Sequence, residues 1–518
     1  MVEFDKFSKV LRSTFFNGNK EVHTSKNGRV CYIDAYAQNY WSTFFPRLLF
    51  AKGLMDSGKI DKVIVLSGMC SKELCRICDI LGFEIENIYV MNRLNLLRAI
   101  LYSLKWFLMW NIMKVVGIKI CGVPCADFLA DYIIRCKEEV FNVNKIRVCD
   151  LRLCVSFARL ILNIKAFFEK NNPSFFLTHE TGYWYGAVIK LAEKMKSQLI
   201  QCTAGNRIIV FGETVGLSQC PASLWHFEVE EALKEIDRNN FDYISWADNY
   251  YEKRSKGLTD EAARTAYVDR VDMDRKTWIE KNGVDPNKKN IVIMAHCFSD
   301  CANTATEKSV FKNYYEWLVG TLDIIKEIDN VNWILKAHPS RHIYHEGDGI
   351  YEIFNRYKKD NVYVLEDSIS SNTVLKIADA VITVMGTCGM EYPAHGIPAV
   401  CAGYSMYGHL GITIDAENYN EYKKILSNLD KIEPLSKDEI DKAKKISCAY
   451  FSLHNAVDRF DQYFVDAYNY PVEDGNNYLL RKIIDDFENN ITLKSSMFYV
   501  QGLLYKEEGK RCLAITKF

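Results

Sequence analysis

The sequence lacks an excess of charge of either sign. Its 65 Lys and Arg residues balance 66 Asp and Glu residues, which gives a formal net charge of −1 at pH 7. Proteins that bind nucleic acid through its phosphates depend on a basic surface field, so a nucleic-acid partner is disfavoured. Internal repeats and low-complexity tracts are absent too, and 518 residues are enough for two or three folded domains.

No secretory signal is expected either, because residues 1–20 contain charges and no apolar core segment. The 17 cysteines are therefore expected to be reduced thiols in a cytoplasmic protein. Cys75 and Cys78 fit the apolar face of a helix, and no second Cys-x-x-Cys pair follows them at a zinc-binding spacing. No metal site is predicted.

No apolar run is long and uninterrupted enough for a clear transmembrane span. The most apolar stretch, residues 94–116, contains three basic residues, Arg98, Lys105 and Lys114. Two interpretations remain open for it. It is either a helix buried against its own domain or a partner, or a helix in the membrane interface with Trp106, Phe107, Trp110 and the nearby leucines beside the basic residues.

The N-terminal half has no Gly-x-Gly-x-x-Gly turn and so gives no indication of a dinucleotide cofactor. It does contain short apolar runs at residues 30–33, 62–66, 172–178 and 198–202, and helical patterns lie between them. Strands that alternate with helices in this way indicate a doubly wound parallel sheet. The loops after the last two strands should lie at the carboxyl edge of that sheet, where ligands bind.

The C-terminal half carries three groups of residues of the kind that hold an anion. Two short apolar runs, residues 333–335 and 380–384, predict buried parallel strands. The first is followed by a lysine and a His-Pro pair, and the second by a glycine turn that lets backbone amides approach a phosphate. Two serines at a predicted helix start add hydroxyl groups suited to phosphate oxygens. The candidates are Lys336, His338, Pro339, Ser370, Ser371, Gly386, Thr387 and Gly389.

The order of these groups is more specific than any one of them. Strand-Lys-x-His-Pro, then Asp-x-x-Ser, then Ala-Asp-x-x-(apolar)-Thr-x-x-Gly-Thr-x-Gly-x-Glu resembles the C-terminal nucleotide-binding half of GT-B glycosyltransferases. The resemblance is greatest to the bacterial capsule polysaccharide biosynthesis proteins, which include Kdo transferases, and fainter to the bacterial sialyltransferases. It extends over residues 291–422 and covers the N-terminal half only in outline.

The resemblance implies an α/β fold in which two Rossmann-like doubly wound parallel-sheet domains face a cleft, the GT-B arrangement. We expect an N-terminal acceptor-binding domain with a helical insertion at residues 1–283 and a nucleotide-sugar-binding domain at residues 284–465. Residues 466–518 are expected to form a helical extension that packs back on the N-terminal domain.

The family's residue roles carry over to the matching positions. The imidazole and the serines would contact the nucleotide and its phosphates, the glycine turn would contribute amides, and Glu391 would bond a ribose hydroxyl. The first loop of this half is similar to the one that faces the donor in the capsule proteins. This adds His296, Ser299 and Asp300 as substrate-binding candidates, although structural hydrogen bonding is an equally good interpretation of them.

In the N-terminal half, Glu180 is the leading candidate for the catalytic base, and His179 is the alternative. Attack by a sugar hydroxyl on an anomeric carbon needs a group that takes up the proton, and both residues follow a predicted strand. Both could instead cap the next helix. Arg207 would bind an acidic sugar or a phosphate, or would pair with a carboxylate of its own domain.

These features predict an enzyme, a metal-independent GT-B glycosyltransferase that moves a sugar from a nucleotide donor to a cell-surface polysaccharide or a lipid-linked acceptor. No cofactor is expected beyond the nucleotide-sugar co-substrate. CMP-linked acidic sugars such as Kdo or sialic acid fit the His-Pro and serine pattern, whereas the glycine turn equally suits UDP or GDP sugars. The alternatives are a UDP-N-acetylglucosamine 2-epimerase-like isomerase, a CDP-glycerol glycerophosphotransferase and a non-catalytic capsule assembly scaffold. We expect a cytoplasmic protein. If its acceptor is lipid-linked, it would also contact the inner face of the membrane peripherally.

Overall fold

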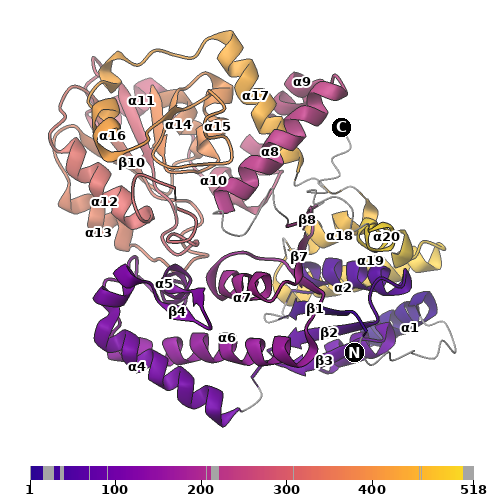
Figure 1. Cartoon of the computed structure of the whole chain (residues 1–518). Helices are drawn as coiled ribbons and strands as arrows, with labels where there is room; N and C mark the ends of the chain where they lie inside the picture. The colour runs from indigo at the N-terminus through magenta and orange to yellow at the C-terminus, as the bar shows by residue number, and fades with distance from the viewer. Residues whose placement is uncertain are drawn as a thin grey trace. The chain divides into compact units, whose positions relative to one another are not determined.

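The chain forms two compact units in a computed structural model (Figure 1). Unit 1 comprises Met1–Ala126, Lys145–Ser218 and Ser452–Lys517, and unit 2 comprises Asp127–Asn144 and Gln219–Phe451 with Phe518. These limits differ from the expected boundaries, since the helices before residue 283 group with unit 2. The structure describes residues 2–15, 28–35, 40–68, 71–89, 92–205, 207–211, 221–306, 308–453, 456, 458–468 and 470–505.

The sheet of unit 1 has six strands in the order β3-β2-β1-β6-β7-β8. Neighbouring strands are parallel except β7 and β8, which are antiparallel. The carboxyl ends of the central strands β1 and β6 therefore lie together, and this is where a doubly wound sheet binds ligands. The strands are β1 Val30–Ala35, β2 Lys62–Ser67, β3 Glu84–Asn87, β6 Phe175–Thr178, β7 Gln198–Thr203 and β8 Arg207–Val210, and a separate pair is formed by β4 Lys119–Ile120 and β5 Val123–Pro124.

The helices of unit 1 include the last three of the chain, whose apolar side chains join the core of the N-terminal sheet. Phe464 of α18 stacks on Phe45 of α2, for example. Helices α2 and α20 touch through glycines, since a Cβ at Gly53 would lie 2.3 Å from the carbonyl oxygen of Tyr499. The helices are α1 Val2–Phe15, α2 Trp41–Asp56, α3 Lys72–Leu81, α4 Arg93–Val116, α6 Leu151–Asn171, α7 Tyr183–Lys194, α18 Arg459–Tyr468, α19 Val472–Glu488 and α20 Met497–Leu504. Among the described residues, no helix is both long and apolar enough to cross a membrane.

The sheet of unit 2 also has six strands, in the order β11-β10-β9-β12-β13-β14, and all of them are parallel. Both of its faces are covered. Ile291 and Ile293 of β9 belong to one apolar core, and Val292 between them belongs to another on the opposite face. The strands are β9 Asn290–Met294, β10 Asn332–Lys336, β11 Val362–Leu365, β12 Ala380–Thr383, β13 Ala399–Cys401 and β14 Ile414–Asp415.

The helices of unit 2 are α5 Ala126–Arg135, α8 Pro221–Arg238, α9 Tyr243–Ser255, α10 Glu261–Tyr267, α11 Arg275–Asn282, α12 Tyr314–Ile325, α13 Gly349–Arg356, α14 Ser371–Ile377, α15 Cys388–Glu391, α16 Tyr419–Leu426 and α17 Lys437–Ser452. Of these, α12, α13, α14 and α15 connect successive strands of the sheet, whereas α8–α11 precede β9 and α16 and α17 follow β14. The predicted α/β class with two Rossmann-like parallel sheets is thus confirmed.

Candidate functional site

A pocket opens in unit 2 beyond the carboxyl ends of β9, β10 and β12. These neighbouring parallel strands end at the same edge, so the loops that follow them meet there. Arg254 and Tyr267 line the pocket, although the sequence analysis did not single them out. Thr383, a position of the quoted motif to which no role was given, lines it as well. Of the sequence-predicted candidates, those in the lining are His296, Lys336, His338, Pro339, Ser371, Gly386, Thr387 and Glu391. Groups separated by dozens of residues thus surround one pocket.

Lys336 brings a buried positive charge to this pocket. It is the last residue of β10 and is only 3% exposed. No described residue forms a hydrogen bond or an ion pair with its ammonium group. Burial, with the nearby charge of Arg270 acting in the same direction, lowers the pKa of Lys336 to about 8. Asp367 attracts this ammonium group without contacting it. A buried cation with no direct ion-pair partner among the described residues is suited to bind an anion that enters the pocket.

His338 offers the pocket a neutral hydrogen-bond donor. Its Nδ1 accepts the backbone N–H of Ser340 at 3.2 Å and lies 3.1 Å from Sγ of Cys297. Burial, followed by the charge of Lys336, lowers the pKa of His338 to about 4, so the ring is neutral near pH 7. Because Nδ1 accepts, the proton is on Nε2, which can donate to a phosphate oxygen.

His296 supports the glycine turn through the hydroxyl group of Thr383. Its ring stacks on Tyr314 with the centroids 4.3 Å apart. Its Nε2 lies 2.9 Å from Oγ1 of Thr383, and that hydroxyl in turn accepts the N–H of Gly386 at 3.1 Å. Burial, followed by His338, lowers the pKa of His296 to about 3. These contacts are structural hydrogen bonds, and substrate contact by His296 stays a prediction.

Glu391 is held by an arginine that the sequence analysis missed. Arg254 of α9 donates through Nε and Nη2 to the two carboxylate oxygens of Glu391, each at 3.0 Å, and through Nη1 to Asp260 at 2.7 Å. Burial by itself would lower the pKa of Arg254, but the negative charge of Glu391 outweighs it and raises that pKa well above its usual value. Both oxygens of Glu391 are thus engaged already, so a ribose hydroxyl would have to share them with Arg254.

Ser370 and Gly389 hold the local backbone and are not in the pocket lining. Ser370 caps α14, because its hydroxyl accepts the backbone N–H of Asn372 at 3.2 Å. Gly389 allows α15 to pack on Tyr407, since a Cβ at this position would lie 2.0 Å from the Tyr407 hydroxyl oxygen. These two members of the motif shape the turn that carries the pocket residues.

Ser299 and Asp300 follow β9 in a loop that is likewise not in the pocket lining. The Ser299 hydroxyl donates to the Glu346 carboxylate at 2.9 Å, and its backbone N–H donates to the same oxygen at 2.8 Å. Burial raises the pKa of Glu346 to about 7, although these hydrogen bonds oppose it. Asp300 is exposed. Contact of either residue with a substrate therefore stays a prediction.

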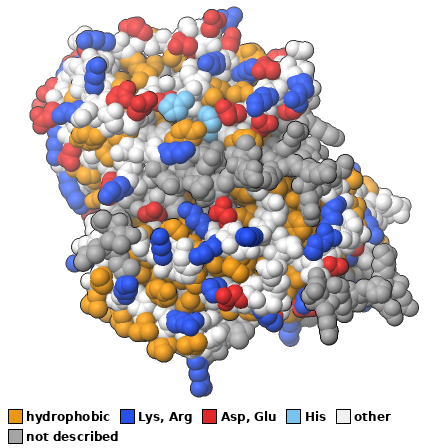
Figure 2. Space-filling model, viewed as in Figure 1, with side chains coloured by type: hydrophobic (Ala, Val, Ile, Leu, Met, Phe, Trp, Pro, Cys, Tyr) orange, Lys and Arg blue, Asp and Glu red, His pale blue; other side chains and the backbone are white. Residues whose placement is uncertain are grey.

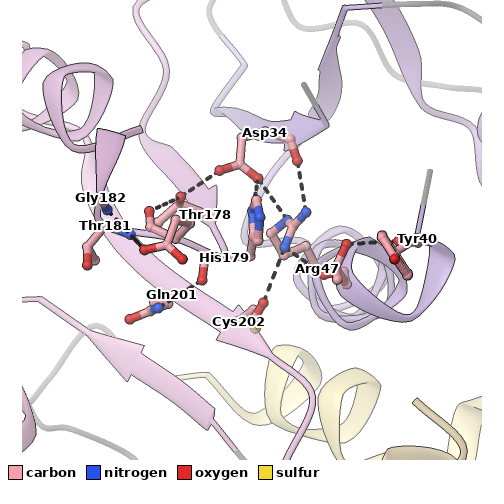
Figure 3. Close-up of polar contacts among 11 residues, drawn as sticks. Asp34, Tyr40, Arg47, Thr178, His179, Thr181, Gly182, Gln201 and Cys202 are labelled. Carbon is pink, nitrogen blue, oxygen red and sulfur yellow. Dashed lines mark hydrogen bonds and ion pairs between the residues drawn. The ribbon is translucent and has the colours of Figure 1, made fainter. Parts of the chain in front are cut away.

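A second polar cluster lies in unit 1 where β1 and β6 end (Figure 3). Asp34 accepts a hydrogen bond from Oγ1 of Thr178 at 2.5 Å, and Nδ1 of His179 and Nε of Arg47 lie 3.3 Å and 3.0 Å from its Oδ1. Burial alone would raise the pKa of Asp34, but the charges of Arg47 and then His179 outweigh it and hold the pKa below its usual value. The ionised Asp34 favours the proton of His179 on Nδ1, which leaves Nε2 as an acceptor.

The Glu180 carboxylate holds the loop into α7. Its Oε1 accepts the backbone N–H groups of Thr181 at 2.7 Å and Gly182 at 2.9 Å. Figure 3 shows Thr181 and Gly182 together with Asp34 and His179. Arg207 begins β8, and its side chain lies outside the part of the chain that the structure describes. In the described ranges, no group of three or more His, Cys, Asp or Glu residues is arranged to hold a metal ion.

The chain thus has two six-stranded Rossmann-like sheets, each with polar groups at the carboxyl edge of its central strands. Residues 249–432 match the family of capsule polysaccharide biosynthesis proteins. The match lies within unit 2 and includes every strand of its sheet. It confirms the family resemblance for this region. No curated protein sequence matches the chain.

Several solved structures are similar to the chain at low identity. A β-Kdo 2,4-transferase, KpsC of Thermosulfurimonas dismutans, is 12% identical with a TM-score of 0.33, over 57% of this chain and 87% of that one. A glycosyltransferase of Rickettsia africae ESF-5 is 13% identical with a TM-score of 0.26, over 91% and 100% of the two chains. The UDP-GlcNAc 2-epimerase of Neisseria meningitidis is 10% identical with a TM-score of 0.24, over 81% and 98%. Similarities this low do not define an activity.

Proposed function

We propose that this protein is a glycosyltransferase of capsule polysaccharide biosynthesis, which moves a sugar from a nucleotide donor to a cell-surface glycan or a lipid-linked acceptor. The observation that carries the proposal is the buried ammonium group of Lys336, which shares one pocket with the neutral donor His338. A family match over the same residues agrees with it.

Unit 2 would bind the donor. Lys336 would neutralise phosphate charge, and Nε2 of His338 would donate to a phosphate oxygen of the leaving nucleotide. The hydroxyl groups of Ser371 and Thr387, which also line the pocket, would complete the contacts. These groups would stabilise the departing phosphate without a metal ion.

Unit 1 would bind the acceptor and supply the base. The contacts favour His179 over Glu180 for this role, although sequence alone favoured Glu180. One oxygen of Glu180 is occupied by two backbone amides, whereas Asp34 orients His179 with Nε2 as the acceptor. A histidine oriented by a buried carboxylate is a common arrangement for taking a proton from a hydroxyl group.

The nucleotide is the least constrained part of the proposal. A CMP-linked acidic sugar such as Kdo or sialic acid agrees with the His-Pro and serine pattern, and a UDP or GDP sugar agrees equally with the glycine turn. An arginine at position 207 would suit an acidic sugar. The isomerase, glycerophosphotransferase and scaffold alternatives have no contact in the described residues that favours them.

A thermal-shift panel of CMP, CDP, UDP and GDP tests the donor site. We expect at least one nucleotide to raise the Tm of the full chain, and His338→Ala to abolish that rise. His342→Ala is the matched control, because the His342 side chain belongs to the same loop and is 61% exposed. If no nucleotide raises the Tm of the unmodified protein, the pocket is not a nucleotide site. Free UDP formed from a UDP-sugar without an acceptor would favour the isomerase.

A further inference from the structure

Helix α4 of unit 1 carries a row of exposed leucines along one face. The members of this leucine stripe are Leu94, Leu97, Leu101, Leu104 and Leu108, and between 44% and 76% of each is exposed. Their alternating spacing of three and four residues places them on one side of the helix. Figure 2 shows hydrophobic side chains gathered at the lower left, where α4 lies in Figure 1. A continuous apolar surface of this kind marks an interaction site.

The opposite face of α4 is fixed on α6, so the leucine stripe cannot turn inward. Asn95, only 5% exposed, donates to Oδ1 of Asn163 on α6 at 3.0 Å. Trp106 and Trp110 are buried as well, at 0% and 3% exposure. The membrane-interface interpretation of this helix is therefore wrong for the two tryptophans, because they pack inside unit 1, and it stays open for the leucines. The leucines are the residues left on the surface.

The charged residues of α4 and of the segments that flank it in sequence are all basic. Between Glu86 and Asp127 the sequence has no acidic residue, and it has five basic ones, Arg93, Arg98, Lys105, Lys114 and Lys119. Arg98 and Lys105 each follow a stripe leucine directly, and both are exposed. Apolar side chains bordered by cations are the combination that an amphipathic helix uses at an anionic lipid surface.

A second copy of the chain fits this surface poorly. Two stripes packed against each other in antiparallel orientation would bring the Arg98 and Lys105 side chains opposite their counterparts, and like charges at such positions repel. An anionic lipid surface instead supplies a phosphate for each cation and an apolar layer for the leucines.

We propose that α4 is a membrane-docking helix, with its leucine stripe in the acyl region and Arg93, Arg98 and Lys105 at the phosphates of anionic lipids. The inference goes beyond sugar transfer and does not depend on it. It would place a transferase where lipid-linked acceptors are found. The test therefore measures binding to vesicles and needs no donor or acceptor.

Co-sedimentation of the full chain with vesicles tests the proposal. We expect binding to phosphatidylcholine vesicles that contain one third phosphatidylglycerol, and binding weaker by at least about tenfold to pure phosphatidylcholine vesicles or in high salt. The triple variant L97Q/L101Q/L104Q should lose binding by at least about tenfold. The double variant R98Q/K105Q should lose most of the preference for phosphatidylglycerol.

The matched control is L258Q/I343Q/L504Q, which changes three exposed apolar residues outside α4 and should bind as the unmodified chain does. All stripe substitutions are at exposed positions, so far-UV circular dichroism and the Tm should stay unchanged. Equal binding of the stripe variant and the unmodified chain would overturn the proposal, as would no binding to anionic vesicles. A dimer in solution that the stripe substitutions dissociate, without vesicle binding, would assign the stripe to a second copy.

Discussion

Replacing Lys336 by methionine should separate the stability of the pocket from its ability to bind an anion. Methionine has nearly the length of lysine and no charge, so Lys336→Met removes the buried ammonium group and leaves the volume filled. The two effects have opposite signs. The variant should unfold less readily than the unmodified protein at pH 7, and it should bind a nucleotide more weakly.

The size of the first effect follows from the pKa. The pKa of Lys336 falls from its ordinary 10.5 to about 8 in the folded protein, a difference that corresponds to about 3 kcal/mol. Between these two values the unfolded chain binds more protons than the folded one, so the stability of the unmodified protein rises as the pH increases from about 8 to 10.5. Lys336→Met should therefore gain up to about 3 kcal/mol below pH 8 and little above pH 10.5.

The second effect follows from the charge of the ligand. A hydrogen bond between an ammonium group and a phosphate contributes about 1.5–3 kcal/mol, so the variant should bind the nucleotide about 10- to 100-fold more weakly at pH 7. Only the protonated lysine binds the anion well. The affinity of the unmodified protein should therefore fall by about tenfold for each pH unit above about 8, and that of Lys336→Met should stay flat there.

Isothermal titration with the nucleotide that gives the largest thermal shift measures the affinity, and urea unfolding at pH 7 and pH 10 measures the stability. Lys276→Met is the control, because the Lys276 side chain is 85% exposed. An affinity that is equal in Lys336→Met and the unmodified protein would refute the assignment of this lysine to the anion. A variant less stable than the unmodified protein at pH 7 would show that the charge has a counter-ion.

Two further outcomes are expected. Arg254→Met leaves the Glu391 carboxylate buried without its partner and should lower the free energy of unfolding by about 3–5 kcal/mol, and a second substitution, Glu391→Leu, should recover part of it in urea unfolding. His179→Gln should abolish sugar transfer while Glu180→Gln retains most of it, and both should keep the nucleotide-induced rise in Tm; full activity of His179→Gln would remove this residue from the mechanism.

The sheets could be predicted from the sequence because buried parallel strands leave a local pattern. The run at residues 30–33 lies within β1 Val30–Ala35, and the run at residues 380–384 contains β12 Ala380–Thr383. Both faces of these strands are buried, so consecutive residues are apolar and β-branched. The limits of the two units have no such local pattern in the sequence. Helices α8–α11 have the charged sequence expected of a helical linker, and their packing on unit 2 depends on tertiary contacts.

The polar partners could not be predicted, since the sequence does not reveal which distant residues meet. Arg254 stands in a charged helical stretch, where an arginine usually faces solvent, yet it bonds Glu391 137 positions later. Asp34 ends a predicted strand, but its contact with His179 is 145 positions away. Residues at the ends of predicted strands stay candidates. Their pairing required the fold.

The motif residues of unit 2 divide into two groups with different physical roles. Gly389 and Ser370 bond or pack within the turn, so they would be needed in a protein of this fold even if it bound nothing. Lys336 has the opposite character, because a buried charge with no direct ion-pair partner among the described residues costs stability. A chain that kept the glycine turn and replaced this lysine by an apolar residue would retain the architecture and lose the anion. The lysine, and not the glycine turn, is therefore the residue whose presence argues for an active donor site.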